Sequence, residues 1–156
     1  MLIEKFFEAF KKLDANAMNA CYADDIGFYD PMFDLLKGEQ VKAMWQMLCK
    51  NASNFSLTYT HITDLGDGYY TCNWEATYLY SITKRKVVNN AKAFFKIENE
   101  QIQEHSDAWS LHKWSGQALG YSGKLLGWMG LFRNRIKNTA KKKLLQYIQT
   151  NQQYKS

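Results

Sequence analysis

The spacing of apolar residues changes from about 3.6 to 2 near residue 52, and this change constrains the fold more than any other feature. Upstream, apolar residues recur at helical spacing in residues 2–13 and 38–52. Downstream, apolar and polar residues alternate in four segments separated by short turns, namely residues 54–65, 69–82, 87–97 and 102–114. Four such segments in a row predict an antiparallel meander of β-strands.

Further elements extend this pattern into a complete α+β domain. Asp14 is a suitable N-cap for a second, short helix through Met18 to Tyr22. Residues 26–31 read as a short strand that ends at the single proline. Residues 119–149 return to helix. The apolar stripe of this last segment comprises Leu125, Met129, Phe132, Ile136, Ala140, Leu144 and Ile148. The order α-α-β-α-β-β-β-β-α predicts helices that cover one face of a curled sheet.

Charge is distributed unevenly along the chain. The net charge is +5, yet residues 124–156 hold eight Lys and Arg and no Asp or Glu. The first 123 residues therefore carry 12 basic and 15 acidic side chains, a net charge of −3. A body without a basic face argues against nucleic-acid binding. The three cysteines form no CxxC pair, which favours a reducing cytoplasm over a disulfide framework.

The segment from Ile102 to Trp114 alternates like a strand and carries ionisable groups on its more apolar side. Successive residues of a strand point to opposite faces, so His105, Asp107 and Trp109 share one face. That face is the bulkier one and is expected to point inward. Buried ionisable groups are costly unless they are paired or used. An acid–base pair and a satisfied polar pair bonded to Tyr or Asn neighbours both account for the pattern.

Charged residues indicate which faces of the two preceding strands point inward. Lys92 and Lys96 place Asn89 on the inner face of one strand, and Glu75 places the even positions of the other inside. Two inward alanines near Asn89 leave space where a packed core would hold larger side chains. The inward polar groups then gather among aromatic residues; they are Tyr78, Asn89, His105 and Asp107. Such a group predicts a site for a small hydrophobic molecule.

With these features the chain resembles the nuclear transport factor two superfamily. The resemblance rests on the order of elements, on "YADDIGFYDP" at residues 22–31 and on "EHSDAW" at residues 104–109. It implies a SnoaL-like domain over residues 1–115, in which a cone-shaped, curved antiparallel sheet and N-terminal helices enclose a pocket. It also implies a homodimer formed through the outer face of the sheet. Residues 116–156 are expected to be a basic amphipathic helical extension that packs on this domain.

The chemistry of the family is expected to carry over only in part. In ketosteroid isomerases the general base lies in the segment matched by "YDP", which assigns that position to Asp30. The two oxyanion donors of those enzymes align with Phe6 and Ala93, and neither side chain can donate a hydrogen bond. The loss of one such donor costs about 10²–10³ in rate. The resemblance therefore favours the polyketide cyclases and limonene epoxide hydrolases, which draw carboxylates from the later strands, where Asp107 lies.

These arguments define a candidate site for isomerisation, cyclisation or water addition without a metal or another cofactor. The candidate catalytic residues are Asp107, His105 and Asp30. The candidate ligand-binding residues are Tyr22, Tyr29, Trp74, Tyr78, Asn89, Phe95 and Trp109. For Asp30 the alternative is turn chemistry, because Asp before Pro commonly starts a turn. A two-histidine, one-carboxylate metal site is disfavoured because His112 has the opposite parity to His105.

The C-terminal extension admits two interpretations. Its apolar stripe either packs on the domain, where it closes the pocket mouth or a dimer seam, or lies on an anionic membrane surface. The second interpretation makes the chain a non-catalytic ligand-binding or interaction protein, which uses the basic C-terminal helix on a partner or on an anionic membrane. The glycines at 116, 120, 123, 127 and 130 indicate either close helix packing or breaks in the helix.

Overall fold

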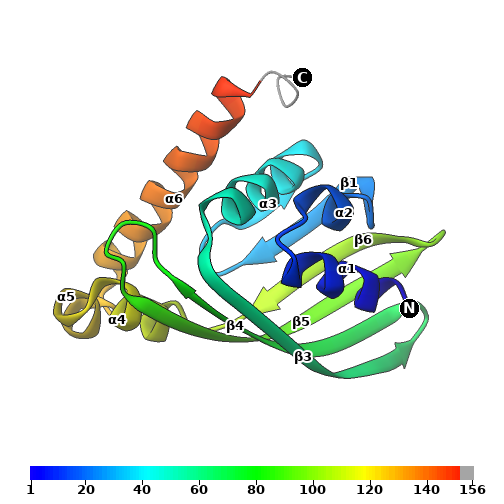
Figure 1. Ribbon diagram of the computed structural model, residues 1–156, viewed down its shortest axis with the longest axis horizontal. Helices are drawn as coiled ribbons and strands as arrows, with labels where there is room; N and C mark the ends of the chain where they lie inside the picture. Colours follow the sequence, from blue (N-terminus) through cyan, green and yellow to red (C-terminus); the bar gives the residue numbers. More distant parts are fainter. Residues whose placement is uncertain (152–156) are drawn as a thin grey trace.

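Six strands form one curved sheet in the computed structural model, which describes residues 1–151 (Figure 1). The strands are β1 (Tyr22–Asp30), β2 (Asp34–Lys37), β3 (Ser53–Gly66), β4 (Tyr69–Leu79), β5 (Lys86–Glu98) and β6 (Gln101–Ala108). Their order in the sheet is β2-β1-β6-β5-β4-β3. The meander predicted for the last four strands is confirmed, since each of them pairs antiparallel with the next.

Three N-terminal helices cover one face of this sheet, and three more follow it (Figure 1). The first group is α1 (Leu2–Lys11), α2 (Ala15–Asn19) and α3 (Glu39–Asn51). The second group is α4 (Leu111–Leu119), α5 (Tyr121–Leu126) and α6 (Gly130–Thr150). The Asp14 side chain accepts a hydrogen bond from the Ala17 N–H at 3.0 Å, so the predicted N-cap of the second helix is confirmed. The predicted α+β fold class is likewise confirmed.

Three local expectations are wrong. β1 pairs parallel with β6, so the sheet is not wholly antiparallel. The chain leaves β1 through β2 and α3 and returns beside it only after the meander, and this route sets the direction of the pair. The sequence pattern does not predict β2, which follows a turn at residues 31–33 and begins at Asp34 with a φ of 58°. The helical spacing of residues 38–52 predicts that Leu48 lies on the buried side of that helix, yet Leu48 is 38% exposed, because it lies in the last turn of α3 and lines a cavity.

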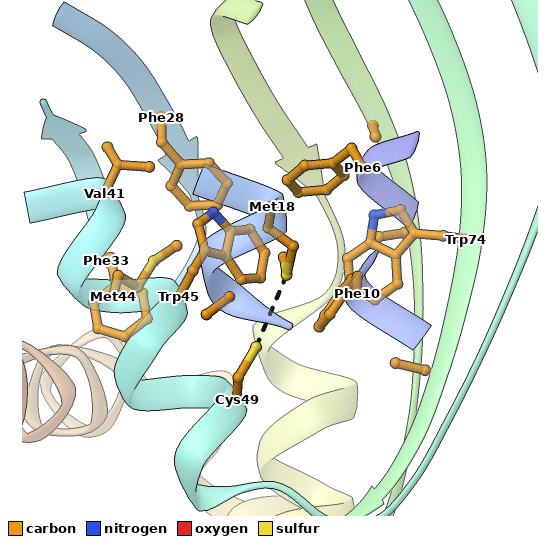
Figure 2. Close-up of a cluster of buried hydrophobic side chains, with 14 of the residues drawn as sticks. Phe6, Phe10, Met18, Phe28, Phe33, Val41, Met44, Trp45, Cys49 and Trp74 are labelled. Carbon is orange, nitrogen blue, oxygen red and sulfur yellow. Dashed lines mark hydrogen bonds between the residues drawn. The ribbon is translucent and has the colours of Figure 1, made fainter. Parts of the chain in front are cut away.

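Aromatic side chains from the helices and the sheet fill the core (Figure 2). Phe10 of α1 meets Trp45 of α3 at 5.1 Å between ring centroids and an interplanar angle of 66°. Phe28 of β1 meets the same indole at 5.6 Å and 74°. Such edge-to-face pairs each stabilise a core by roughly 0.5–1.5 kcal/mol beyond area burial. The dashed line in Figure 2 joins Cys49 Sγ to the Met18 sulfur at 3.8 Å, which ties α3 to α2.

Glycines separate three C-terminal helices: α5 and α6 take the place of the single helix predicted over residues 119–149, and α4 precedes that range. Gly120 separates α4 from α5 with a φ of +69°, a backbone conformation that favours glycine. Gly123 of α5 packs so closely on the Ser115 carbonyl oxygen of α4 that an added Cβ would collide with it. The glycines therefore provide both the breaks and the close packing that the sequence pattern leaves as alternatives.

The long helix α6 runs past α3 and contacts it (Figure 1). Leu144 is its buried residue, and Ile136, Ala140 and Ile148 are partly buried against the core. An ion-pair clamp holds the same helix to β2: Lys137 Nζ and Lys141 Nζ each lie 2.6 Å from a different carboxylate oxygen of Asp34. We refer to this group of three charged residues as the Asp34 clamp.

Candidate functional site

A cavity of about 420 Å³ opens between α3, the inner face of the sheet and the first half of α6. This volume lies within the range of about 300–1,000 Å³ that is usual for small-molecule sites. Its walls are mainly apolar; they include Phe10, Phe28, Met44, Trp45, Trp74 and Ile136. Figure 2 shows how Phe10, Met44, Trp45 and Trp74 converge from α1, α3 and β4. The cavity can therefore enclose an apolar molecule.

Four of the polar side chains that line this cavity come from four different strands of the sheet. They are Asp30 of β1, Tyr78 of β4, Asn89 of β5 and Asp107 of β6. Strand alternation places these residues on the inner face, and Asn89 lies opposite Ala76 in the β4–β5 register. The open space adjoins Ala76, which lines the cavity, whereas Ala93 is fully buried and does not.

Two N–H donors hold one oxygen of Asp107. The Trp74 indole donates from Nε1 to Oδ1 at 2.9 Å, and His105 Nε2 lies 3.1 Å from the same oxygen. Within residues 1–151, Oδ2 has no hydrogen-bond donor. Asp107 is 4% exposed and lines the cavity, so Oδ2 is the oxygen left for a ligand.

A buried chain of hydrogen bonds continues from His105 into the core. The Tyr22 hydroxyl lies 2.8 Å from His105 Nδ1 and accepts a hydrogen bond from Trp45 Nε1 at 2.9 Å. Because the hydroxyl has one proton and accepts from Trp45, that proton is directed to Nδ1. Nε2 then carries the imidazole proton and donates a hydrogen bond to Asp107 Oδ1. Burial is the largest cause that raises the pKa of Tyr22 well above its ordinary value, so its hydroxyl stays protonated.

Asp30 forms a turn and also lines the cavity. Its Oδ1 accepts hydrogen bonds from the backbone N–H of Met32 at 3.0 Å and of Phe33 at 2.7 Å. Burial raises the pKa of Asp30 to about 7, the bond from Phe33 opposes this shift, and the charge of Asp107 adds to it. At neutral pH this carboxyl group is therefore balanced between its acid and base forms.

Tyr78 presents a hydroxyl proton at the cavity wall. Its oxygen accepts a hydrogen bond from Trp114 Nε1 of α4 at 2.8 Å. Burial raises the pKa of Tyr78 to about 12, so the phenol remains protonated at neutral pH. An oxygen that already accepts from an indole has its own O–H free to donate, and the cavity is where a ligand acceptor would meet it.

The structure divides the ten predicted site residues into two groups. Six line the cavity: Asp30, Trp74, Tyr78, Asn89, Asp107 and Trp109. Tyr22, Phe95 and His105 are buried outside its lining. Tyr29 is 50% exposed, because alternation along β1 turns Phe28 and Asp30 inward and Tyr29 outward. Tyr29 therefore does not reach the cavity.

Several lining residues are not among those that the sequence assigns to the site. Met44 and Trp45 are expected on the buried side of a helix, but nothing in the sequence alone separates a core face from a cavity wall. Trp114 lies on α4, because β6 ends at Ala108 before the alternating pattern does. His112 is likewise helical and exposed, so the parity argument against it as a metal ligand does not apply to the actual structure.

Two features of the described part of the chain bear on metals and membranes. Residues 1–151 contain no group of three or more His, Cys, Asp or Glu side chains arranged to bind a metal ion. None of the helices in this range combines the length and hydropathy that a bilayer-spanning segment requires.

Comparison with known proteins identifies one family model. The SnoaL-like domain model matches residues 3–105, which include β1 to β5 and most of β6. The match ends before α4, so the three C-terminal helices lie outside it. No functionally curated protein matches the chain.

Solved structures with the same fold share little sequence identity with this chain. A Catenulispora acidiphila protein with a ketosteroid isomerase-like fold, solved with trimethylamine, is 16% identical, with a TM-score of 0.66 over 75% of this chain and 91% of its own. An epoxide hydrolase of the limonene epoxide hydrolase-like type from M. tuberculosis is 14% identical. The match has a TM-score of 0.64 and covers 80% of this chain and 90% of the hydrolase. The epoxide hydrolase/cyclase-like enzyme SalBIII, which acts in pyran ring formation in salinomycin, is 14% identical. The match has a TM-score of 0.64 and covers 72% of this chain and 90% of SalBIII. These likenesses establish the fold.

Proposed function

The chain belongs to the SnoaL-like domain family, and from this membership and the geometry of its cavity we propose that it is an acid–base enzyme acting on an apolar small molecule. The reaction class is water addition or cyclisation, in which one oxygen attacks carbon while another leaves. Two neighbours of the same fold act on epoxides or form a pyran ring, which supports this class.

One observation carries the proposal: two carboxyl groups from different strands line the same apolar cavity in unlike surroundings. Asp107 accepts hydrogen bonds from two side-chain N–H groups. Asp30 is 8% exposed, and burial raises its pKa to about 7. A pair of carboxyl groups whose environments differ in this way is suited to divide acid and base roles.

The roles follow from the atoms that remain available. Asp107 Oδ2 takes the proton of the attacking water or hydroxyl group, and a new carbon–oxygen bond forms. Protonated Asp30 gives its proton to the oxygen of the breaking carbon–oxygen bond. For an epoxide and water the product is a diol, and one proton must pass from Asp107 back to Asp30 to reset the pair. Tyr78 and Asn89 hold the substrate oxygen atoms by hydrogen bonds.

His105 is a positioning residue in this scheme. It contacts Asp107 but does not line the cavity, so it acts on the substrate only through that carboxylate. Steroid isomerisation through an oxyanion hole is not proposed, because Phe6 is fully buried and Ala93 carries no donor. Both positions instead pack near the His105–Asp107 pair: Phe6 lies edge-on to the imidazole at 5.4 Å, and Ala93 is the register partner of Asp107.

The proposal is tested with styrene oxide as the apolar epoxide, in water enriched in oxygen-18. We expect label in the diol and a rate that falls about 10²-fold or more in Asp107→Asn and Asp30→Asn. Asp64→Asn is the matched control, because Asp64 also accepts a backbone N–H two residues on but is exposed. If all variants bind an apolar fluorescent probe and none, the parent included, opens styrene oxide or a hydroxy-epoxide, the chain is a binding protein.

A homodimer through the outer face of the sheet is part of the proposal. Phe94, Ser106, Tyr29 and Leu35 are successive register partners across β5, β6, β1 and β2. Phe94, Tyr29 and Leu35 are each at least 41% exposed, so they form an apolar row across that face. Light scattering should give a dimer for the parent and a monomer for Tyr29→Ser with Phe94→Ser. The three buried, free cysteines suit a reducing compartment such as the cytoplasm.

A further inference from the structure

Six large apolar side chains are exposed at the corner where α5 meets α6. They are Tyr121, Leu125, Leu126, Trp128, Met129 and Leu131, and we refer to them as the apolar corner. Tyr121 is 82% exposed, Trp128 72% and Leu131 78%. A soluble surface rarely presents so many large apolar residues within one short segment unless another body covers it. We therefore expect another molecule or surface to cover the apolar corner.

The charges around the apolar corner have one sign. Lys124 lies within the segment that forms it and Arg133 follows that segment by two residues, and both side chains are exposed. The chain has no Asp or Glu after Asp107, so the helices that form the corner contain no acidic residue. Lys137 and Lys141, farther along α6, are engaged by Asp34, whereas Lys124 and Arg133 have no carboxylate partner within residues 1–151. The corner is therefore an apolar surface bordered by unpaired cations.

This combination selects among possible partners. A second copy of the same corner would bring Lys124 and Arg133 toward their own like charges, which opposes self-association. An anionic lipid surface would pair with the cations and accept the apolar side chains at the level of the headgroups. Trp128 and Tyr121 are the residue types that favour the bilayer interface, because their rings are apolar with one polar group.

The apolar corner lies next to the cavity. Phe132 and Ile136, which line the cavity, follow it directly in the first turns of α6. A surface that docks at the corner would therefore lie beside the side of the cavity formed by α6. An apolar molecule dissolved in a bilayer could then reach the cavity without crossing bulk water.

We propose that the apolar corner, with Lys124 and Arg133, docks the protein on an anionic lipid surface. The side chains insert at the interface while the domain remains outside the bilayer. Docking is a binding event that requires no turnover, so it can be tested independently of the acid–base chemistry.

Vesicle flotation with the full chain tests this proposal. We expect binding to phosphatidylcholine vesicles that contain phosphatidylglycerol, little binding to phosphatidylcholine alone, and release at high salt. Trp128 is the most exposed of the tryptophans, so binding should shift tryptophan emission to the blue, and lipids brominated in the acyl chain should quench it. Trp128→Phe should retain binding and lose most of both signals.

Three variants separate the contributions. Leu125→Ser with Trp128→Ser should lower vesicle affinity by about tenfold or more. Lys124→Gln with Arg133→Gln should weaken binding by about fivefold for each cation removed. Leu65→Ser is the matched control, since Leu65 is 58% exposed but lies near the end of β3. It should bind as the parent does.

Several outcomes would overturn the proposal. The parent could remain unbound to anionic vesicles, bind neutral vesicles equally well, or bind no better than the Leu125 and Trp128 double variant. Concentration-dependent self-association that the same double variant abolishes would make the corner a protein–protein surface instead.

Discussion

The Nε2 atom of His105 lies 3.1 Å from Oδ1 of Asp107, and only the aspartate lines the cavity. The imidazole therefore supports the carboxylate from the protein interior. Tyr22 and Trp45 extend this support, and the single hydroxyl proton of Tyr22 determines which imidazole nitrogen donates to Asp107. The protonation state of this network can be measured directly.

Tyr22→Phe should remove the preference of the His105 imidazole for a single tautomer. The change removes the donor to Nδ1 and leaves the buried Trp45 N–H without its acceptor, which should cost about 1–3 kcal/mol of unfolding free energy. Nitrogen-15 NMR of the imidazole should show the Nε2–H form in the parent and a mixture of tautomers in the variant. Tyr121→Phe is the control, because that ring is exposed and outside the network. A parent protonated on Nδ1 alone would contradict the assignment.

Asp30→Asn should remove a pH dependence of stability. The pKa of Asp30 is raised from 3.8 to about 7 in the folded protein. The stabilisation that its proton supplies is complete below pH 3.8 and is lost as pH rises through about 7. Between pH 5 and 8 the parent should lose roughly 2–3 kcal/mol relative to Asp30→Asn, measured by chemical denaturation. Asp64→Asn should follow the parent, and parallel curves for Asp30→Asn and the parent would refute the shifted pKa.

The same group sets the expected pH profile of activity. If protonated Asp30 is the acid, the rate of epoxide opening should decline as pH rises through about 7. In Asp30→Asn that decline should disappear together with most of the rate. A parent whose rate is constant from pH 6 to 9 would remove Asp30 from the acid role without affecting the cavity.

Two alanines on neighbouring strands should respond oppositely to enlargement. Ala76→Leu fills space inside the cavity, so it should lower the affinity for an apolar fluorescent probe by about tenfold with little change in melting temperature. Ala93→Leu overpacks a fully buried position and should cost about 1–3 kcal/mol while probe binding persists in the folded fraction. Fluorescence titration and thermal melts of both variants give the answer. Equal effects would mean that the probe does not occupy this cavity.

Asp34→Asn should loosen α6 by breaking the Asp34 clamp. The hydrogen bond from Lys137, followed by that from Lys141, lowers the pKa of Asp34. The clamp therefore stabilises the protein above the ordinary pKa of 3.8 and is lost as pH falls through the lowered value. Because Asp34 is about one-third exposed, we expect a loss of only about 0.5–1 kcal/mol. Hydrogen exchange of the α6 amides should accelerate, and high salt should have the same effect on the parent.

Asp67→Asn provides the control for the clamp. Asp67 also has a left-handed backbone, with a φ of 52° against 58° for Asp34, but its side chain pairs with no described residue. Asparagine tolerates this conformation, so backbone strain is matched in the two variants. An equal acceleration of α6 exchange in both would show that the turn, and not the ion pairs, holds the helix.

Local sequence pattern determined much of the fold. Alternation with turn residues specified β3 to β6, and the helical stripe specified α1 and α3, because the side-chain periods of strand and helix are fixed by backbone geometry. The same alternation placed Asp107 and Asn89 on the inner face. The order of charged residues along the chain by itself separates the acidic body from the basic C-terminal segment.

Tertiary structure decided how these pieces meet. The parallel pairing of β1 with β6 depends on where the chain returns after the meander, which no local period encodes. Alternation equally permits His105 at a cavity wall or behind it, and only packing against Phe6, Phe28 and Phe95 places it in the core. The cavity itself is space left between α3, α6 and the sheet, so its extent depends on how helices at opposite ends of the chain are held together.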